Sequence, residues 1–212
     1  MSVSKKITGH LTRQKVKFEI VPHKKVYTAY DLAQTLGERL DRIAKSVLVK
    51  VELPSMEKRG ARYYVVVVPA SYNIDMQKLK KALRAKKAEF APEKVMKRLG
   101  IEPGALSPFG SLRDLGVVVD KGLLKVKEAI VGAESFTESL RLKVKDLVKT
   151  EGSLVAVVGK KNRLRLQKKT AKKRPPAKKK VVRKKVVRKR TARKRPAAKR
   201  PAKRKGSAKR RR

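Results

Sequence analysis

Apolar and polar residues alternate in several short stretches of this chain. Residues 15–21 alternate in the manner of a half-buried strand. Residues 46–52 and 62–69 are rich in Val and Tyr, which predicts two longer strands. Later stretches of the same character predict further strands at 117–120, 128–132, 140–144 and 154–158.

Segments with helical spacing lie between the predicted strands. Thr28 and Asp31 resemble a capping box, with Asp in place of the usual Glu, and Gly37 follows the helix that they begin. Residues 76–83 place their apolar side chains on one helical face. Residues 92–100 begin with Pro and end with Gly, as the two ends of a helix commonly do.

The order of these elements indicates the fold class. Strands and helices alternate through residues 1–159, with one more short helix predicted at 145–149. This alternation predicts an α/β (α+β) domain with a mixed sheet and flanking helices. A domain of about 150 residues buries roughly 68–70% of its unfolded surface, so this segment is long enough to form its own core.

The charge of the chain indicates the kind of partner it binds. Among 212 residues, 61 are Lys or Arg and 17 are Asp or Glu, a formal net charge of +44. Self-repulsion of this size opposes a compact state unless a polyanion offsets it. DNA or RNA is therefore the leading partner, and an anionic membrane surface is the minor one.

Most of this charge lies at the C-terminal end of the chain. Residues 160–212 hold 30 Lys or Arg and no acidic residue, which leaves 31 basic and all 17 acidic residues in 1–159. The segment has no aromatic residue and cannot bury enough surface to offset its ordering entropy. We therefore predict a folded domain at 1–159 and a disordered polybasic tail at 160–212.

The predicted tail has the composition of a nucleic-acid-binding segment. It repeats a Lys-Val-Val-Arg-Lys unit at 180–184 and 185–189. Its Lys, Arg, Ala and Pro content resembles the tails of linker histones and of bacterial histone-like proteins. The predicted nucleic-acid contacts are made by Lys178, Lys179, Lys180, Arg183, Lys184, Lys185, Arg188, Lys189, Arg190, Arg193, Lys194 and Arg195.

The chain lacks the residues of several common kinds of site. It has no Cys, which excludes disulfides, thiolate catalysis and Cys-based zinc sites. Its two histidines, His10 and His23, have no metal-ligand spacing, and no G-x-S-x-G elbow accompanies them. The longest apolar run, 65–70, is far shorter than the ~20 residues that span a bilayer. We expect no signal peptide, metal, cofactor or membrane partner, and a location in the cytoplasm or at the nucleoid.

Three segments carry candidate chemistry. Lys45 lies between two small residues, immediately before a predicted apolar strand. Residues 99–110 form a dense Gly/Pro loop with an apolar centre, which is more elaborate than a plain turn. Asp120 ends the apolar strand predicted at 117–120.

These segments, preceded by VYTAYDLAQTLG at 26–37, resemble the YbaK/ProX family of aminoacyl-tRNA deacylases, a domain also inserted in some prolyl-tRNA synthetases. The resemblance covers roughly residues 10–158 and is strongest in AKSVLV at 44–49 paired with EPGALSPFG at 102–110. It implies a mixed α/β domain around a curved sheet. It also implies hydrolysis of the ester of a mischarged tRNA, without a metal or a covalent intermediate.

The resemblance further implies roles for individual residues. Lys45 matches the family's essential lysine, the catalytic residue, and Asp120 matches a recurrent acid near the site. The loop at 104–108 matches the loop that shapes the amino-acid pocket and supplies backbone donors, while the terminal ribose hydroxyl of the tRNA assists the attacking water. The implied substrate-binding residues are Tyr27, Thr28, Ser46, Gly104, Ala105, Leu106, Ser107, Pro108, Phe109 and Asp120.

The residue types fit this chemistry because an aminoacyl ester is already activated. The site mainly has to position the ester and stabilise a developing oxyanion. Backbone N–H groups of a Gly/Pro loop can do this without a side chain. A lysine is a point charge suited to a phosphate or to the terminal ribose region.

Each candidate residue also has an ordinary interpretation. Lys45 is one of 61 basic residues and could lie on a solvated face, and the loop could be a rigid turn between a helix and a strand. Asp120 could cap the turn that follows it. His23 lies where the family often carries a His-Pro pair, but here the order is Pro22-His23, so we interpret it as a surface or packing residue. Where a Gly-rich turn is expected, the chain has Glu134, which narrows or recharges the edge of the site.

We interpret the chain as a trans-acting editing enzyme whose basic tail holds tRNA. The alternative is a histone-like DNA- or RNA-binding protein whose editing-like domain is vestigial or regulatory. Attachment of the tail to anionic lipid is a third hypothesis, but nothing amphipathic supports it. The sequence does not define the edited amino acid, the tRNA or the oligomeric state.

Overall fold

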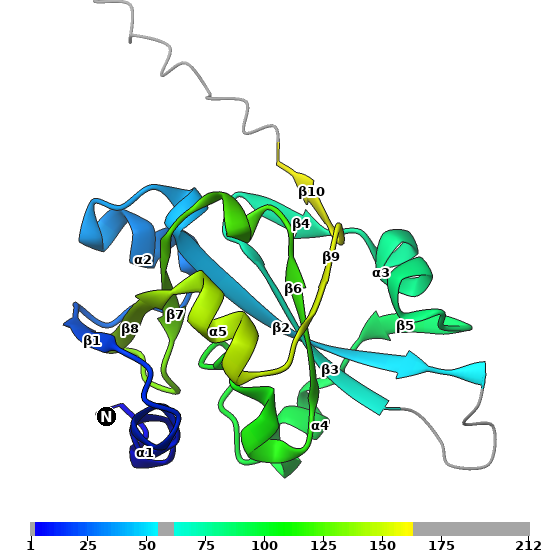
Figure 1. The fold of residues 1–212 in the computed structure, drawn as a ribbon, viewed down its shortest axis with the longest axis horizontal. Coiled ribbons are helices and arrows are strands. Elements are labelled where there is room, and N and C mark those ends of the chain that lie inside the picture. The colour runs from blue at the N-terminus through cyan, green and yellow to red at the C-terminus, as the bar shows by residue number, and fades with distance from the viewer. Residues whose placement is uncertain (1–2, 55–61, 163–212) are drawn as a thin grey trace, which may run out of the picture. The chain divides into compact units, whose positions relative to one another are not determined.

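A mixed β-sheet forms the centre of the protein (Figure 1). The computed structural model describes residues 3–54 and 62–162. Within these ranges an eight-stranded sheet runs in the order β1-β8-β7-β2-β3-β6-β9, with β5 paired to β2, and β4 pairs with β10 separately. The strands are β1 (Phe18–Pro22), β2 (Ile43–Glu52), β3 (Arg62–Pro69), β4 (Tyr72–Ile74), β5 (Lys87–Phe90), β6 (Gly116–Asp120), β7 (Glu128–Gly132), β8 (Glu138–Lys143), β9 (Leu154–Ala156) and β10 (Gly159–Lys161).

Strand β2 is the long central strand of this sheet. It runs antiparallel to β3 along most of its length, antiparallel to β5 at its C-terminal end, and parallel to β7 at its N-terminal end. Strand β6 is parallel to both β3 and β9. This mixture of neighbours confirms the predicted α/β class with a mixed sheet.

Helices flank the sheet on both faces (Figure 1). In the described residues they are α1 (Lys5–Arg13), α2 (Ala29–Leu36), α3 (Met76–Leu83), α4 (Glu93–Arg98) and α5 (Val144–Thr150), with short 3₁₀ helices η1 (Leu40–Arg42), η3 (Gly110–Arg113) and η4 (Leu123–Lys125).

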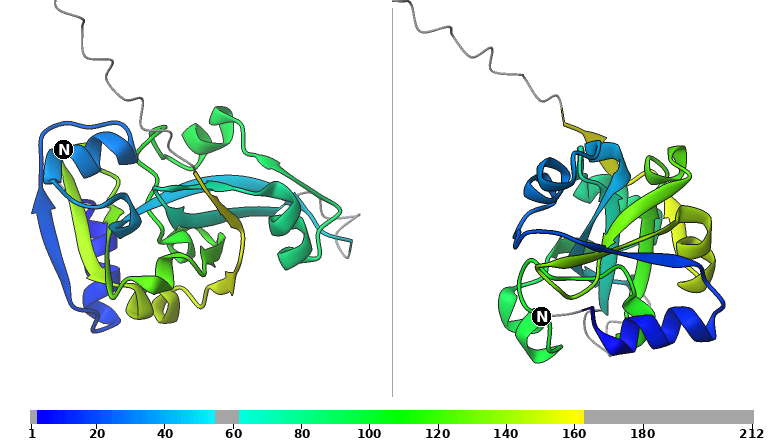
Figure 2. Two further views of the ribbon diagram at one scale, coloured as in Figure 1. Left: turned by 90° about the horizontal axis from the view of Figure 1, so that it is seen from above. Right: turned by 90° about the vertical axis from the view of Figure 1, so that its left-hand side faces the viewer.

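Alternation along β3 divides the core between the two faces of the sheet. Val65 and Val67 pack in a cluster with residues of α1, α4 and α5, whereas Val66 and Val68 pack in a cluster with α3. Helix α2 covers a third cluster, which contains Ile43 of β2. Figure 2 shows α1 and α2 on opposite sides of β1. The same alternation along β2 decides which face each site residue occupies.

Helix α2 has the ends that the sequence predicts. Thr28 Oγ1 accepts a hydrogen bond from Asp31 N (3.1 Å) and donates one to Asp31 Oδ2 (2.8 Å). Gly37 follows the helix with a φ of +65°, a left-handed conformation that suits Gly. The other predicted helices and strands lie within a few residues of their predicted bounds.

Strands β1 and β2 each begin three residues from the predicted position, and each difference has a local cause. β1 begins at Phe18 rather than at residue 15, because Lys15 has a φ of +54° in the turn that follows α1. β2 begins at Ile43 rather than at residue 46, because its first residues already pair with β7. Lys45 therefore lies inside the strand and not before it.

Several elements are not evident from the sequence. Strands β4, β5 and β10 have three or four residues each, too few to show an alternation. Helix α1 buries Ile7 and Leu11, but charged and polar residues surround these positions in the sequence. The predicted domain boundary at 159 falls on the first residue of β10. The nucleic-acid contacts predicted at 178–195 lie outside the described residues.

Candidate active site

Lys45 is half-buried on the face of the sheet that α3 covers. Its neighbour on β3 is Val68, which belongs to the cluster beneath α3. Lys45 Nζ donates a hydrogen bond to Tyr72 O at 3.0 Å. Among the described residues no carboxylate pairs with this ammonium, and burial lowers the pKa of Lys45 below the ordinary value of 10.5. The ammonium therefore has no neutralising carboxylate within the described part of the chain.

Strand β2 has an open edge beside Lys45. β7 pairs with the first two residues of β2 and β5 pairs from Val49 onward, so residues 45–47 have no strand on that side in the described part of the chain. Ser46 points to the opposite face from Lys45, and its Oγ is buried without a hydrogen-bond partner among the described residues. Since buried hydroxyl groups normally have a partner, Ser46 keeps an unused donor and acceptor at this gap.

The loop at 99–110 packs on the face toward which Ser46 points. Gly104 has a φ of +92°, and a Cβ there would lie 3.3 Å from Tyr27 O, so both the backbone conformation and the space favour Gly. The residues that follow Gly104 are all buried, with Leu106 and Phe109 in the cluster shared with α1, α4 and α5: Ala105, Leu106, Ser107, Pro108 and Phe109.

This loop meets the sheet where β2 and β7 separate. The last pair of the two strands is Ala44–Val131. A Cβ on the next residue of β7, Gly132, would lie 3.0 Å from Leu106 O. Lys45 is the next residue of β2. Lys45 is in register with Gly132, so the Leu106 carbonyl and Lys45 lie at the same point along the sheet, beside the gap in β2 pairing.

Several amide groups of the loop, those of Leu106, Ser107 and Phe109 among them, have no protein acceptor in the described ranges. Ala105 N donates to Glu102 O at 3.0 Å, whereas the N–H groups of Leu106 and Ser107 make no such bond. Both residues are buried, and a buried N–H without an acceptor is rare in native proteins. Such donors are what a developing oxyanion requires, so these two amides are candidate substrate contacts.

Glu134 fixes the loop to the turn after β7. Its Oε1 accepts a hydrogen bond from Ser107 Oγ at 3.2 Å and pairs with Arg113 Nη1. Arg113 Nε also donates to Leu99 O at 3.1 Å. The same guanidinium therefore contacts both the start of the loop and Glu134. Glu134 has a φ of +59°, an uncommon conformation for Glu. It lies at the edge of the loop with its charge paired, and an effect of Glu134 on the substrate site stays a prediction.

A pocket of about 510 Å³ opens beside Gly104. Tyr27 and Phe136 line it, with ring centroids 5.0 Å apart and planes tilted by 52°. Lys25 Nζ lies 5.3 Å from the centre of the Tyr27 ring. Tyr27 is 60% exposed, so its ring presents an aromatic surface to solvent. Thr28, in contrast, is engaged in capping α2.

Asp120 has a structural environment. Its carboxylate is buried and accepts hydrogen bonds from Gly122 N (2.7 Å), Val158 N (2.8 Å) and Gly159 N (2.7 Å). These bonds cap the turn after β6 and hold the segment that leads into β10. The cap is one of the two roles that the sequence left open, and a role for Asp120 at the substrate stays a prediction.

The histidines and acids of the described residues do not gather into a metal site. His23 Nε2 lies 2.9 Å from Ser139 Oγ and Nδ1 lies 2.9 Å from Lys24 O, which suits a packing role. Within residues 3–54 and 62–162, no group of three or more His, Cys, Asp or Glu could hold a metal ion. No helix in these ranges is long and apolar enough to cross a bilayer.

Three residues of the site are not evident from the sequence. Tyr72 contributes a backbone carbonyl, which has no sequence signal. Arg113 is one of many basic residues, and its distance of 21 positions from Glu134 conceals their pairing. Phe136 is an isolated aromatic residue in a polar stretch, a signal that could have been found.

The fold and the candidate site together define a mixed α/β domain with a half-buried lysine and a loop of unbonded backbone donors. Comparison with known proteins agrees with this class. Residues 23–150 match the family model of the aminoacyl-tRNA editing domain, and the chain belongs to this family. The resemblance seen in the sequence is thereby confirmed.

The chain is similar to proteins named for prolyl-tRNA. The prolyl-tRNA editing protein ProX of Acetoanaerobium sticklandii is 27% identical over 154 residues, which cover 70% of this chain and 90% of ProX. The proline–tRNA ligase of Thermosipho melanesiensis is 32% identical over 115 residues, which cover 54% of this chain. The matched part is only 19% of that ligase, so the similarity concerns one region of a larger enzyme.

Solved structures share the fold. The hypothetical protein APE2540 superimposes with a TM-score of 0.65 at 22% identity, covering 74% of this chain and all of that one. A candidate trans-editing enzyme for prolyl-tRNA synthetase superimposes with a TM-score of 0.61 at 23% identity, covering 75% of this chain and 99% of that one. At these identities the similarity establishes the fold.

Proposed function

We propose that this protein hydrolyses the ester bond of mischarged aminoacyl-tRNA as a separate, trans-acting enzyme. The observation that carries the proposal is the environment of Lys45, a half-buried ammonium that no carboxylate neutralises among the described residues. A buried structural cation is normally paired. An unpaired one beside loop donors suits an anionic ligand, and the 3′ end of aminoacyl-tRNA supplies phosphate and ribose oxygens. Membership of the editing-domain family supports this assignment.

The chemistry needs few protein groups. Water adds to the ester carbonyl, the bond between the carbonyl carbon and the ribose oxygen breaks, and a proton of the water passes to that ribose oxygen, so that the products are the free amino acid and the tRNA. The N–H groups of Leu106 and Ser107 stabilise the oxyanion that forms. Lys45 holds the terminal phosphate or ribose, and the terminal ribose hydroxyl assists the water. No step in this scheme requires a metal.

The amino acid binds where the loop and the turn after β7 meet. Glu134 and Ser107 border this region, and the pocket beside Gly104 adjoins it. A difference of one methyl group in such a pocket changes binding by only ~1–3 kcal/mol, so selectivity among small amino acids is modest. The names of the relatives point to tRNAPro as the first tRNA to test.

The polybasic segment at 160–212 serves as a tether for the tRNA. Phosphate contacts release counterions and raise affinity without selecting a sequence. This role predicts that deletion of residues 163–212 raises the KM for mischarged tRNA while kcat changes little. The same KM at physiological salt would contradict the tether. Equal retention of duplex DNA and tRNA would favour the DNA-binding alternative.

A panel of mischarged tRNAs tests the proposed activity. The full-length protein should release the amino acid from at least one of them, and Lys45→Met should abolish release. Lys50→Met is the matched control, since Lys50 lies on the same strand but pairs with Glu89 at 3.3 Å. Absence of turnover on every substrate, with nucleic-acid binding intact, would leave the DNA- or RNA-binding role.

A further inference from the structure

A charged groove of about 640 Å³ lies between two connecting segments. One segment links α2 to β2, and the other links η4 to β7. Its lining contains three acidic residues, Glu38, Asp41 and Glu128. Its basic residues are twice as many: Arg39, Arg42, Lys125, Lys127, Arg141 and Lys161.

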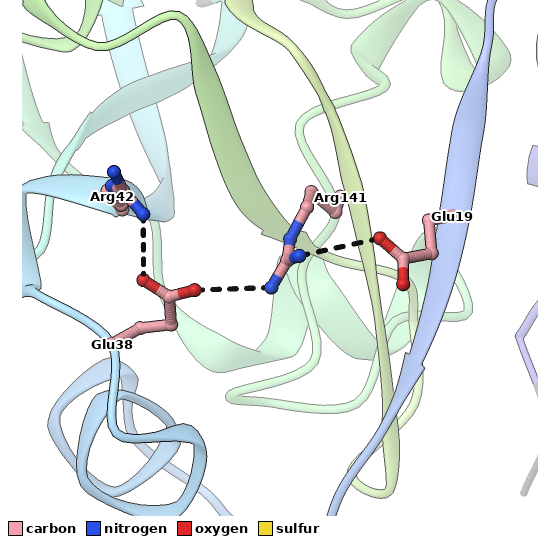
Figure 3. Close-up of polar contacts among 4 residues, drawn as sticks. All are labelled: Glu19, Glu38, Arg42 and Arg141. Carbon is pink, nitrogen blue, oxygen red and sulfur yellow. Dashed lines mark hydrogen bonds and ion pairs between the residues drawn. The ribbon is translucent and has the colours of Figure 1, made fainter.

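The arginines of the groove are engaged with its acids. Glu38 lies between two guanidinium groups, with Oε2 3.4 Å from Arg42 Nη1 and Oε1 3.2 Å from Arg141 Nη2 (Figure 3). Arg141 Nη1 also lies 3.5 Å from Glu19 Oε2 of β1. This chain of ion pairs joins β1, β8 and the α2–β2 connection, and the charges of its two glutamates and two arginines sum to zero.

The negative charge of Asp41 is likewise offset by neighbouring groups. Ser71 Oγ donates a hydrogen bond to Asp41 Oδ1, and Arg39 Nη2 lies 3.3 Å from Asp41 Oδ2. The hydrogen bond from Ser71, then the contacts of Arg39 and the nearby charge of Lys161, lower the pKa of Asp41. The carboxylate is therefore ionised, and neighbouring cations compensate its charge.

The lysines supply the charge that remains. Lys125 and Lys127 are exposed and have no ion-pair partner among the described residues. Lys161 is exposed on β10, one residue before the end of the described chain. The sequence that follows contains no acidic residue. The six basic residues of the groove outnumber its three acidic residues, so its net charge is positive.

The groove is connected to the catalytic lysine through Tyr72. This residue lines the groove, and its carbonyl oxygen accepts the hydrogen bond from Lys45 Nζ at 3.0 Å. We propose that the groove binds the phosphate backbone of the tRNA next to its aminoacylated end, with Lys125, Lys127 and Lys161 as the phosphate contacts. This inference rests on the proposed function. Lysines suit phosphates as mobile point charges, whereas the planar arginine groups here are already occupied by carboxylates.

Binding of uncharged tRNA to the full-length protein tests the groove without requiring turnover. The probe is fluorescently labelled tRNAPro, titrated over a range of salt concentrations with the parent protein and a Lys125→Gln/Lys127→Gln variant. Two lost phosphate contacts should weaken binding and reduce the slope of log K against log salt by about two. The KM for a mischarged tRNA should rise in parallel, with kcat unchanged.

The matched control is Lys78→Gln/Lys81→Gln, which removes the same charge from the exposed face of α3. This control should reduce the slope less than the groove variant does. Equal effects of the two variants, or a groove variant with the parent's slope, would overturn the groove proposal while leaving the deacylase activity untouched. A reduced slope in a protein that hydrolyses no mischarged tRNA would support the groove and contradict the proposed function.

Discussion

Arg113 and Glu134 form an ion pair whose side chains are only 17% and 16% exposed, and the pair joins the candidate loop to the turn after β7. Ser107 Oγ donates to the same carboxylate oxygen, Glu134 Oε1. The position of the buried Leu106 and Ser107 amides therefore depends on a charge pair that lies beside them. Oxyanion stabilisation depends on such donors being held in place before the reaction, so the pair links the stability of the loop to its proposed chemistry.

Replacement of Arg113 should affect both stability and turnover. Arg113→Met leaves Glu134 partly buried without its charged partner, which should lower the free energy of unfolding by about 2 kcal/mol. Urea denaturation measures this loss. Because Ser107 is then less firmly held, kcat for deacylation should fall more than KM rises. The Glu134→Gln/Arg113→Met double variant should recover part of the stability, and additive losses would show that the two residues are not coupled.

Gly104 should tolerate no side chain. Gly104→Ala forces an L-residue into a φ of +92° and places Cβ 3.3 Å from Tyr27 O, so we expect a loss of about 1–2 kcal/mol and a displaced loop. Gly37→Ala is the matched control, because Gly37 also has positive φ but has nothing within 4 Å of its Cβ position. Both variants should be destabilised, and only Gly104→Ala should lose deacylation. Equal activity of the two would contradict a substrate role for the loop.

Asp120 should matter for stability rather than for the reaction itself. In Asp120→Asn an amide nitrogen replaces one acceptor oxygen, which leaves at least one of the three N–H groups without a partner and costs about 2 kcal/mol. Deacylation measured well below the melting temperature should remain near the parent's rate. A folded Asp120→Asn protein with no activity would instead place this acid at the substrate.

The pKa of Lys45 gives the proposed activity a pH dependence. Burial lowers this pKa below 10.5, and only the charged lysine can hold a phosphate, so the lysine-dependent rate should fall as pH rises through that lowered value. Above the folded-state pKa the unfolded chain binds more protons at this residue, so Lys45 should oppose folding most at lower pH. Lys45→Met should therefore keep or raise the melting temperature at neutral pH. A marked drop would indicate that Lys45 is needed mainly for the fold.

Much of the fold follows from local sequence. The ends of α2 are set by Thr28 and Gly37, whose chemistry is local, and the Val-rich runs of β3 and β6 have few alternatives to a buried strand. Strands β4 and β10 could not be predicted because each is three residues long and depends on pairing across the chain. Register has the same long-range origin, so the sequence did not reveal that Lys45 lies within β2.

The site shows the same division. The motif around Lys45 and the loop after Gly104 could be singled out, but not their arrangement beside the same gap in β2 pairing. That arrangement depends on the Ala44–Val131 pair between β2 and β7, which are far apart in sequence. The contacts of Lys45 with Tyr72 and of Arg113 with Glu134 likewise join residues 27 and 21 positions apart.

Single-turnover deacylation of mischarged tRNAPro, compared between Lys45→Met and Lys50→Met in the full-length protein, tests the central claim most directly. The account predicts that Lys45→Met loses the chemical step while Lys50→Met retains the parent's rate, with both proteins folded. Equal rates for the two variants would contradict the assignment of Lys45 as the catalytic residue.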